Sequence, residues 1–277
     1  MIFLHRQDEM ENSDEMYFQS LGWKFEFGNN KSETSILFEL KTKTYLAQFV
    51  LMILFAGEAL TLLAQSDTIP TISTSATIDV VSHYIWRGQD YGHTPSLQPG
   101  LSATWNDFTL GFWGAFRIAG SGDHETDLYV ERTVGPVTFS IWDYWSFSDS
   151  TSTDYFDYNK QTTSHLMEAQ VLLSGGDKLP LNLVGSYLFY GADPSRSIYF
   201  ELQYLHSFGL VDTQVFAGFQ AKGEYYAPKA AFANTGITAT RSFQIVKNWK
   251  LPVNLSFIVN PDSKNIYLVA GITLFNY

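Results

Sequence analysis

The feature that most constrains this chain is a series of segments of about ten residues in which apolar and polar side chains alternate between turn residues. Leu110 and Phe112, for example, share one face of their segment, and Thr109 and Trp113 share the other. A period of two indicates β-strands that separate an apolar from a polar environment. We expect twelve strands, at 75–86, 96–106, 108–117, 124–134, 136–146, 163–173, 181–190, 196–206, 212–221, 232–242, 251–260 and 264–277.

The connections between these segments alternate in length. The first, third, fifth and later odd ones are mostly long or polar, as at 89–95, 147–162 and 222–231, whereas even ones such as Asn106-Asp107 and Gly135-Pro136 are short. Long loops at one end, tight turns at the other and an even strand count are typical of outer-membrane barrels. The sequence therefore predicts an all-β fold, a single antiparallel transmembrane β-barrel of about 12 strands with both termini in the periplasm.

Composition agrees with this prediction. Aromatic residues make up 16% of the 277 residues, which suits two aromatic belts. The mean hydropathy of −0.07 excludes a protein made of many membrane helices. A net charge of −11 argues against a nucleic-acid partner, and the absence of cysteine excludes disulfides and thiolate metal sites. A secreted β-sandwich would also give many short strands, but it would not need aromatic-rich strand ends.

The chain ends in an apolar strand, with Phe275 and Tyr277 on one face. Such an ending fits a last strand that meets the membrane interface and is recognised by the outer-membrane assembly machinery. We expect this strand to pair with the first one, which closes the barrel and removes its edges. The expected partners are therefore outer-membrane lipid, small polar solutes and the assembly machinery.

The N-terminal part is expected to lie outside the barrel. Lys41 and Lys43 precede an apolar run from Tyr45 to Leu63 that ends at small residues, which is the pattern of a secretory signal peptide. We assign 41–64 to this signal peptide and 65–277 to the barrel. Residues 1–40 are interpreted as an over-extended start, not as structured chain. A transmembrane anchor is the alternative for the apolar run.

Three short runs resemble the TorF family of porins in the order in which that family carries them. These runs are Ser82-His83-Tyr84-Ile85-Trp86-Arg87-Gly88, Pro95-Ser96-Leu97-Gln98-Pro99-Gly100-Leu101 and Leu110-Gly111-Phe112-Trp113-Gly114. The resemblance implies an outer-membrane barrel that lets solutes permeate, without a catalytic site. In this interpretation Tyr84 and Trp86 lie in an aromatic belt at the end of the first strand. Arg87 either pairs with a lumen acid or contacts solute.

Charged side chains avoid lipid because a midplane Arg or Lys costs roughly 2–4 kcal/mol. This cost assigns the polar side of each alternation to the lumen. The pore-lining or rim candidates are Asp79, His83, Arg87, Trp113, Arg117, Asp127, Tyr129, Glu131, Glu168, Glu201 and Gln203. Arg241 is also expected to face inward. Arg132 and Asp143 fall on the lipid-facing side, which implies either an interface position or a slip of register.

These residues favour passive diffusion of small polar solutes through a narrow, mildly cation-preferring pore, with no cofactor and no metal. The run Asp123–Asp127 suggests a hard-cation site or, as we prefer, a solvated acidic rim. The loop 147–162 either folds into the lumen or stays outside. The alternatives are a structural or adhesive barrel with a plugged lumen and an outer-membrane hydrolase, for which no Gly-x-Ser-x-Gly elbow occurs.

Overall fold

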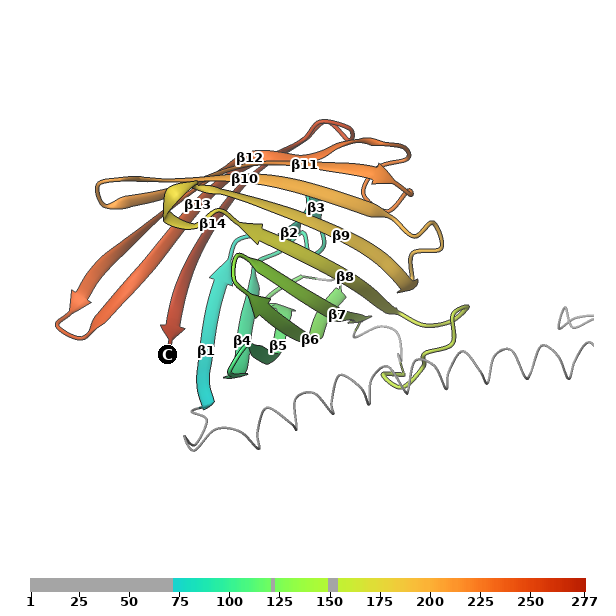
Figure 1. Cartoon of the computed structure of the whole chain (residues 1–277), viewed down its shortest axis with the longest axis horizontal. Helices are drawn as coiled ribbons and strands as arrows, with labels where there is room; N and C mark the ends of the chain where they lie inside the picture. Colours follow the sequence, from blue (N-terminus) through green and yellow to red (C-terminus); the bar gives the residue numbers. More distant parts are fainter. Residues whose placement is uncertain (1–71, 121–122, 149–153) are drawn as a thin grey trace, which may run out of the picture. The chain divides into compact units, whose positions relative to one another are not determined.

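The computed structural model describes residues 72–120, 123–148 and 154–277. The predicted signal peptide and the leader before it lie outside these residues. The described chain forms twelve long strands, a short two-stranded hairpin and one 3-10 turn at Gly176–Lys178 (Figure 1). No helix among the described residues is long and apolar enough to cross a membrane.

The twelve long strands form one closed antiparallel barrel, in which each strand pairs with its sequence neighbours and β1 pairs with β14. They are β1 (Ile72–Val81), β4 (Ser96–Trp105), β5 (Phe108–Arg117), β6 (Asp123–Val134), β7 (Val137–Ser148), β8 (His165–Ser174), β9 (Leu181–Gly191), β10 (Ile198–Phe208), β11 (Val211–Lys222), β12 (Ala231–Val246), β13 (Trp249–Asn260) and β14 (Asn265–Asn276). The predicted fold class and strand number are confirmed.

Only the first predicted strand is wrong in substance. We expected it at 75–86, but β1 ends at Val81, and the chain bends at Ser82 and His83. Residues Ile85–Trp86 and Gln89–Asp90 then form the separate hairpin β2–β3. The alternation Tyr84-Ile85-Trp86 imitates the end of a strand, although its rings pack on protein and not on lipid.

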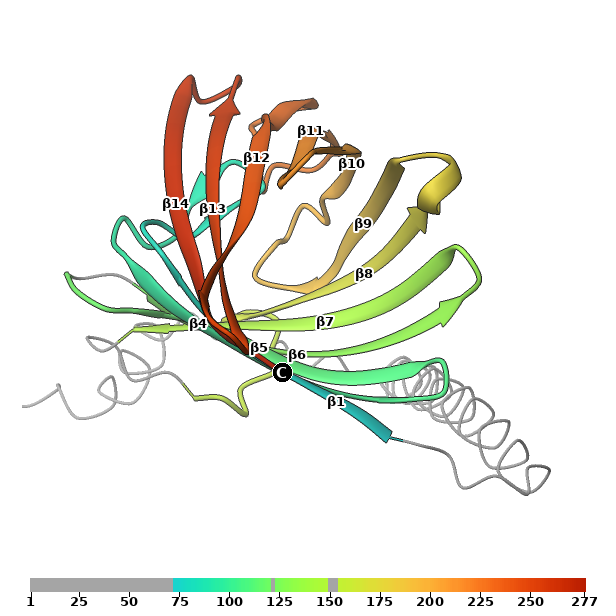
Figure 2. The same ribbon diagram turned by 90° about the vertical axis from the view of Figure 1, so that its left-hand side faces the viewer.

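The two ends of the barrel differ as predicted. At the turn end, β4–β5, β6–β7, β10–β11 and β12–β13 are each joined by two residues. At the loop end lie the longer connections 82–95, 149–164 and 223–230. β14 runs toward the turn end, so Tyr277 lies there, as Figure 2 shows.

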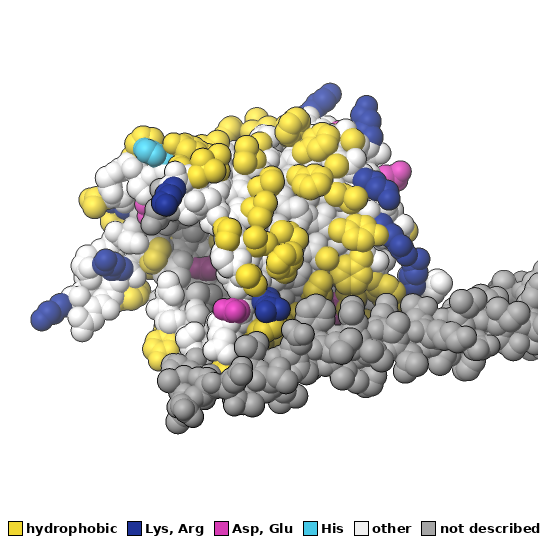
Figure 3. Space-filling model, viewed as in Figure 1, with side chains coloured by type: hydrophobic (Ala, Val, Ile, Leu, Met, Phe, Trp, Pro, Cys, Tyr) yellow, Lys and Arg dark blue, Asp and Glu magenta, His cyan; other side chains and the backbone are white. Residues whose placement is uncertain are grey.

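The barrel is apolar outside and polar inside. Exposed large apolar side chains follow every second position of its strands, for example Leu110 (67% exposed), Leu128 (48%) and Leu255 (51%). Figure 3 shows such side chains spread over the outer face of the barrel. Polar residues at the intervening positions, such as Gln220 (0% exposed) and Ser256 (8%), are buried on the lumen side. A water-soluble protein has the reverse arrangement, and an apolar outer face is the one expected where lipid surrounds a barrel.

Candidate functional site

The segment 82–95, which joins β1 to β4, folds inward; we call it the inward hairpin. Arg87 and Gly88 form its turn, with φ angles of 48° and 78°. A Cβ atom on Gly88 would lie 1.9 Å from the carbonyl oxygen of Ala233 on β12. Glycine is therefore required at position 88 both by the left-handed backbone and by the close approach to the wall.

The inward hairpin reaches opposite walls of the barrel. On one side, the ring of Trp86 packs against Tyr144 of β7, with a centroid distance of 5.2 Å. On the other side, the Asn260 side-chain amide of β13 donates a hydrogen bond of 3.0 Å to the Gly88 carbonyl. β7 and β13 stand half-way round the ring of twelve strands from each other. The inward hairpin therefore crosses the lumen.

Arg87 anchors the hairpin through a buried ion pair. Its guanidinium donates two hydrogen bonds to the Glu168 carboxylate of β8, at 2.5 and 2.8 Å, and a third to the Tyr226 hydroxyl at 2.5 Å. The same guanidinium lies over the rings of Trp86 and Tyr199, 4.6 and 4.5 Å from their centroids. Burial alone would lower the pKa of Arg87, but the charge of Glu168 overrides it and raises the pKa.

A second loop, residues 223–230 between β11 and β12, supports the first. The buried Gln220 side chain holds this loop by accepting from the Tyr226 backbone N–H at 2.7 Å and donating to the Ala227 carbonyl at 2.6 Å. The Gln89 side chain of the inward hairpin donates to the Tyr225 carbonyl at 2.8 Å. Burial raises the pKa of Tyr226, so its hydroxyl stays protonated beside Arg87. The two loops form one plug-like unit at the loop end.

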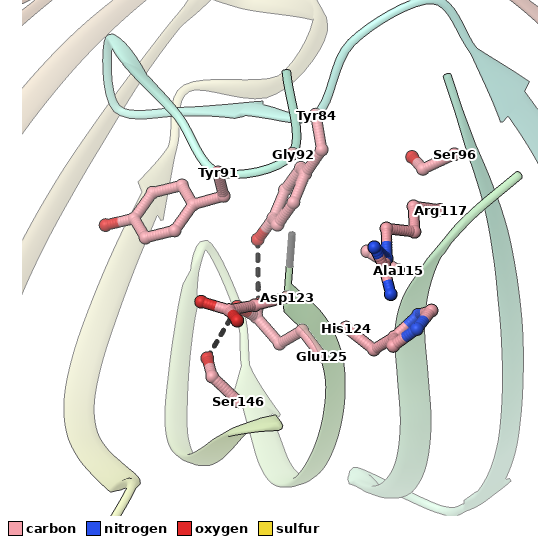
Figure 4. A pocket seen from close by; sticks show the side chains of 10 residues that line it. All are labelled: Tyr84, Tyr91, Gly92, Ser96, Ala115, Arg117, Asp123, His124, Glu125 and Ser146. Carbon is pink, nitrogen blue, oxygen red and sulfur yellow. Dashed lines mark hydrogen bonds between the residues drawn. The ribbon is translucent and has the colours of Figure 1, made fainter. Parts of the chain in front are cut away.

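On the β6 side, the hairpin meets two buried acids. The Tyr84 hydroxyl donates to a Glu125 carboxylate oxygen at 2.8 Å, and the Ser146 hydroxyl donates to the other at 3.5 Å (Figure 4). Asp127 follows on the same face of β6 and is 1% exposed. The pocket between Tyr84, Glu125 and Arg117 has a volume of about 30 Å³, which holds a water molecule and not a solute. The wall is therefore closely packed against the hairpin here.

The solvated acidic rim expected at Asp123–Asp127 is wrong for Glu125 and Asp127. Asp123 is exposed at the start of β6, but Glu125 and Asp127 are buried under the inward hairpin. No cluster of three or more potential metal ligands occurs among the described residues.

The other predicted residues are distributed along the lumen wall. Trp113 packs on the ring of Tyr84 at 5.3 Å, and Tyr129 stacks on Trp142 at 4.2 Å. Glu201 accepts hydrogen bonds from the side chains of Tyr199, Gln203 and Asn234 at 2.5 to 2.9 Å. Asp79 accepts a hydrogen bond of 2.5 Å from the Thr273 hydroxyl. Arg117 donates a hydrogen bond of 3.1 Å to the Gly120 carbonyl. Glu131 lies on the same face of β6 as Asp127, and His83 lies in the chain between β1 and β2.

Two further expectations are corrected, and one alternative that the sequence left open is decided. Tyr84 and Trp86 belong to the inward hairpin and not to an outer aromatic belt. Arg241 faces outward, because it pairs with Val253 on the apolar side of β13 and its guanidinium lies over Phe243 at 4.9 Å. The register does not slip at Arg132: it packs over Phe108, close to the turn end, where its charge reaches the interface.

Asp143 also lies on the outer face, but the described part of the β7–β8 loop covers it. The His165 ring is fully buried between Asp143, at 2.7 Å from one ring nitrogen, and the Tyr155 carbonyl, at 2.7 Å from the other. Tyr158 stacks on His165 at 4.1 Å and donates to Asp143 at 2.8 Å. Both ring nitrogens are engaged by these two oxygens, so the His165 ring is not placed beside a nucleophile. The described residues 154–164 thus pack outside and not in the lumen.

Sequence reasoning did not identify Glu125, Tyr226 and Asn260 as partners of the inward hairpin. The only local signal is the adjacent Tyr225-Tyr226 in a loop, which is unusual for a solvated connection.

Comparison with known proteins adds little to this geometry. No family profile and no curated protein matches the chain. The similar solved structures include a KdgM porin, with 11% identity and a TM-score of 0.41 over 72% of this chain and 97% of that one. Another, described as "Unveiling the Mechanism Behind the in-meso Crystallization of Membrane Proteins", has 6% identity and a TM-score of 0.42 over 74% and 83%. Because both TM-scores are below 0.5, the proposals for this protein rest on the chain's own residues.

Proposed function

We propose that this protein is an outer-membrane β-barrel of the porin type, in agreement with the TorF resemblance. Its support is the apolar outer face of a closed barrel, which a water-soluble protein would have to cover. The exposed Phe275 and Tyr277 at the turn end fit an aromatic girdle. We place the turn end and both termini in the periplasm and the long loops outside the cell.

The proposed activity is passive diffusion of small polar solutes through a narrow pore. Eight strands leave a lumen filled by side chains, and sixteen or more leave a wide channel, so twelve strands give an intermediate one. The observation that carries the proposal is the inward hairpin, which crosses this lumen and whose turn is held to the wall by contacts that each involve a side chain. Solutes would pass between the hairpin and the wall, or after the hairpin shifts.

A structural barrel with a plugged lumen is the second candidate, because the hairpin contacts opposite walls. Single-channel recording of the refolded full-length protein in a planar bilayer separates the two. Discrete conductance steps support the channel. A membrane that stays silent at every voltage and salt concentration contradicts the channel and favours the plugged barrel.

We further propose a mild cation preference. Glu168 neutralises Arg87, whereas Asp79, Glu131 and Glu201 make no ion pair with a base among the contacts of the described residues. Carboxylates in a confined pore concentrate cations and repel anions. The reversal potential in a salt gradient should indicate cations, with a weaker preference in 1 M salt, where the Debye length is about 3 Å. Anion selectivity would contradict this proposal.

A further inference from the structure

The β12–β13 hairpin extends beyond its neighbours at the turn end. β11 pairs with β12 only as far as Thr240, and β14 pairs with β13 only from Val253 onward. Residues 241–252, which we call the β12–β13 tip, therefore pair only within the β12–β13 hairpin. Both edges of the tip carry backbone groups without a strand partner, which cannot lie in hydrocarbon. The tip must therefore reach the polar layer beside the barrel.

One face of the tip continues the lipid-facing side of the barrel. Arg241 and Phe243 stand opposite Val253 and Leu251, in register with the exposed Leu255. Phe243 is 42% exposed, and Trp249 is 41% exposed. Aromatic side chains of this kind concentrate at the boundary between acyl chains and headgroups.

The tip is also basic. Residues 241–252 carry Arg241, Lys247 and Lys250 and no acid, although the whole chain has a net charge of −11. Figure 3 shows Lys and Arg side chains over the far end of this hairpin, at the left of the view. Basic groups beside interfacial aromatics are the combination that anionic lipid surfaces attract.

We propose that the β12–β13 tip binds the anionic phospholipid headgroups of the leaflet on its side of the membrane. A second copy of the chain is the rival occupant, since Asp107 and Asp212 are exposed acids at the same end of the barrel. Lipid is favoured because the basic groups of the tip stand beside aromatic side chains of the kind that gather at headgroups. This inference rests on the membrane location proposed above, but not on solute passage.

Lipid quenching of Trp249 tests the proposal. The full-length protein and its Trp249→Phe variant are reconstituted in phosphatidylcholine vesicles that contain either brominated phosphatidylglycerol or brominated phosphatidylcholine. The difference between the two proteins isolates Trp249, and its quenching by the two lipids gives their relative binding constant. We expect about a tenfold preference for phosphatidylglycerol, which falls toward one in R241Q/K247Q/K250Q and in 1 M salt.

The matched control is K222Q/K229Q/K264Q, which removes the same charge from the loop end and should keep the preference. Equal quenching by both lipids in the unmodified protein overturns this inference but leaves the proposed membrane location standing. If the protein is dimeric and neither lipid quenches Trp249, the tip binds a second copy of the chain, and this result also overturns the inference. If neither lipid quenches any tryptophan, the membrane location itself is wrong, and the inference falls with it.

Discussion

Arg87 and Glu168 form a bidentate ion pair in the lumen, between the turn of the inward hairpin and the wall strand β8. Their side chains are 7% and 0% exposed. The pair couples two parts of the chain that are 81 residues apart, and Tyr226 of a third part joins it. The inward hairpin can therefore take up its position in the lumen only after β8 is in place in the barrel.

Breaking this pair should release the hairpin. Arg87→Met leaves the Glu168 carboxylate buried without its ion-pair partner, and removing one member of a buried pair costs about 3–5 kcal/mol. We expect lower unfolding free energy in vesicles and larger or noisier conductance steps. The double variant R87M/E168Q should be less destabilised than the sum of R87M and E168Q. Strictly additive losses would show that the two side chains do not interact.

Gly88→Ala tests how closely the hairpin approaches β12. The added methyl group would collide with the Ala233 carbonyl and strain a left-handed backbone, so the hairpin should undock and the conductance should increase. Gly92→Ala is the matched control, because its nearest contact, at 3.6 Å from the Thr94 carbonyl, is ordinary. Single-channel recording of the two variants checks the prediction, and equal conductance in both would refute it.

The β7–β8 loop should not control the pore. Asp143→Asn removes the charge that faces His165 and weakens the contact to Tyr158, so we expect residues 154–164 to leave the outer face. Limited proteolysis should then cut this loop faster, while the conductance stays unchanged. Asp262→Asn, in the β13–β14 connection, is the control. A changed conductance in D143N would place the loop in the solute path.

Removing Phe275–Tyr277 should block assembly. The deletion removes two backbone hydrogen bonds between Ala76 and Tyr277, of 3.0 and 2.9 Å, and the pairing of Phe275 with Ile78. The barrel would then keep an open edge at its seam. We expect no protease-resistant, membrane-inserted form, whereas Tyr277→Phe should insert normally. Normal insertion of the truncated chain would show that these contacts are dispensable.

The strands were predictable because lipid imposes a local rule. Each outward position, such as Leu110 or Leu255, must be apolar, and a period of two is visible in a single segment. The pairing of β1 with β14 was predictable because a barrel closes only when its last strand pairs with its first. Arg132 and Asp143 broke the alternation for two different reasons, an interface position and a covering loop.

The inward hairpin was not predictable by the same rule. Tyr84 and Trp86 alternate as a strand does, and the sequence does not tell whether their rings meet lipid or the rings of Trp113 and Tyr144. The contact from Asn260 to Gly88 spans 172 residues and exists only after closure. The charge of Arg87 did indicate a lumen acid as its partner, but not which one.

The conductance of a barrel without the inward hairpin tests the central claim most directly. Val81 and Ser96 are paired neighbours, so a four-residue Gly-Ser turn can replace residues 82–95 without disturbing β1 or β4. The control replaces residues 155–162 of the outer loop with the same turn. We predict that single-channel conductance rises several-fold in the first variant and stays unchanged in the second. Equal conductance with and without the inward hairpin would contradict the account.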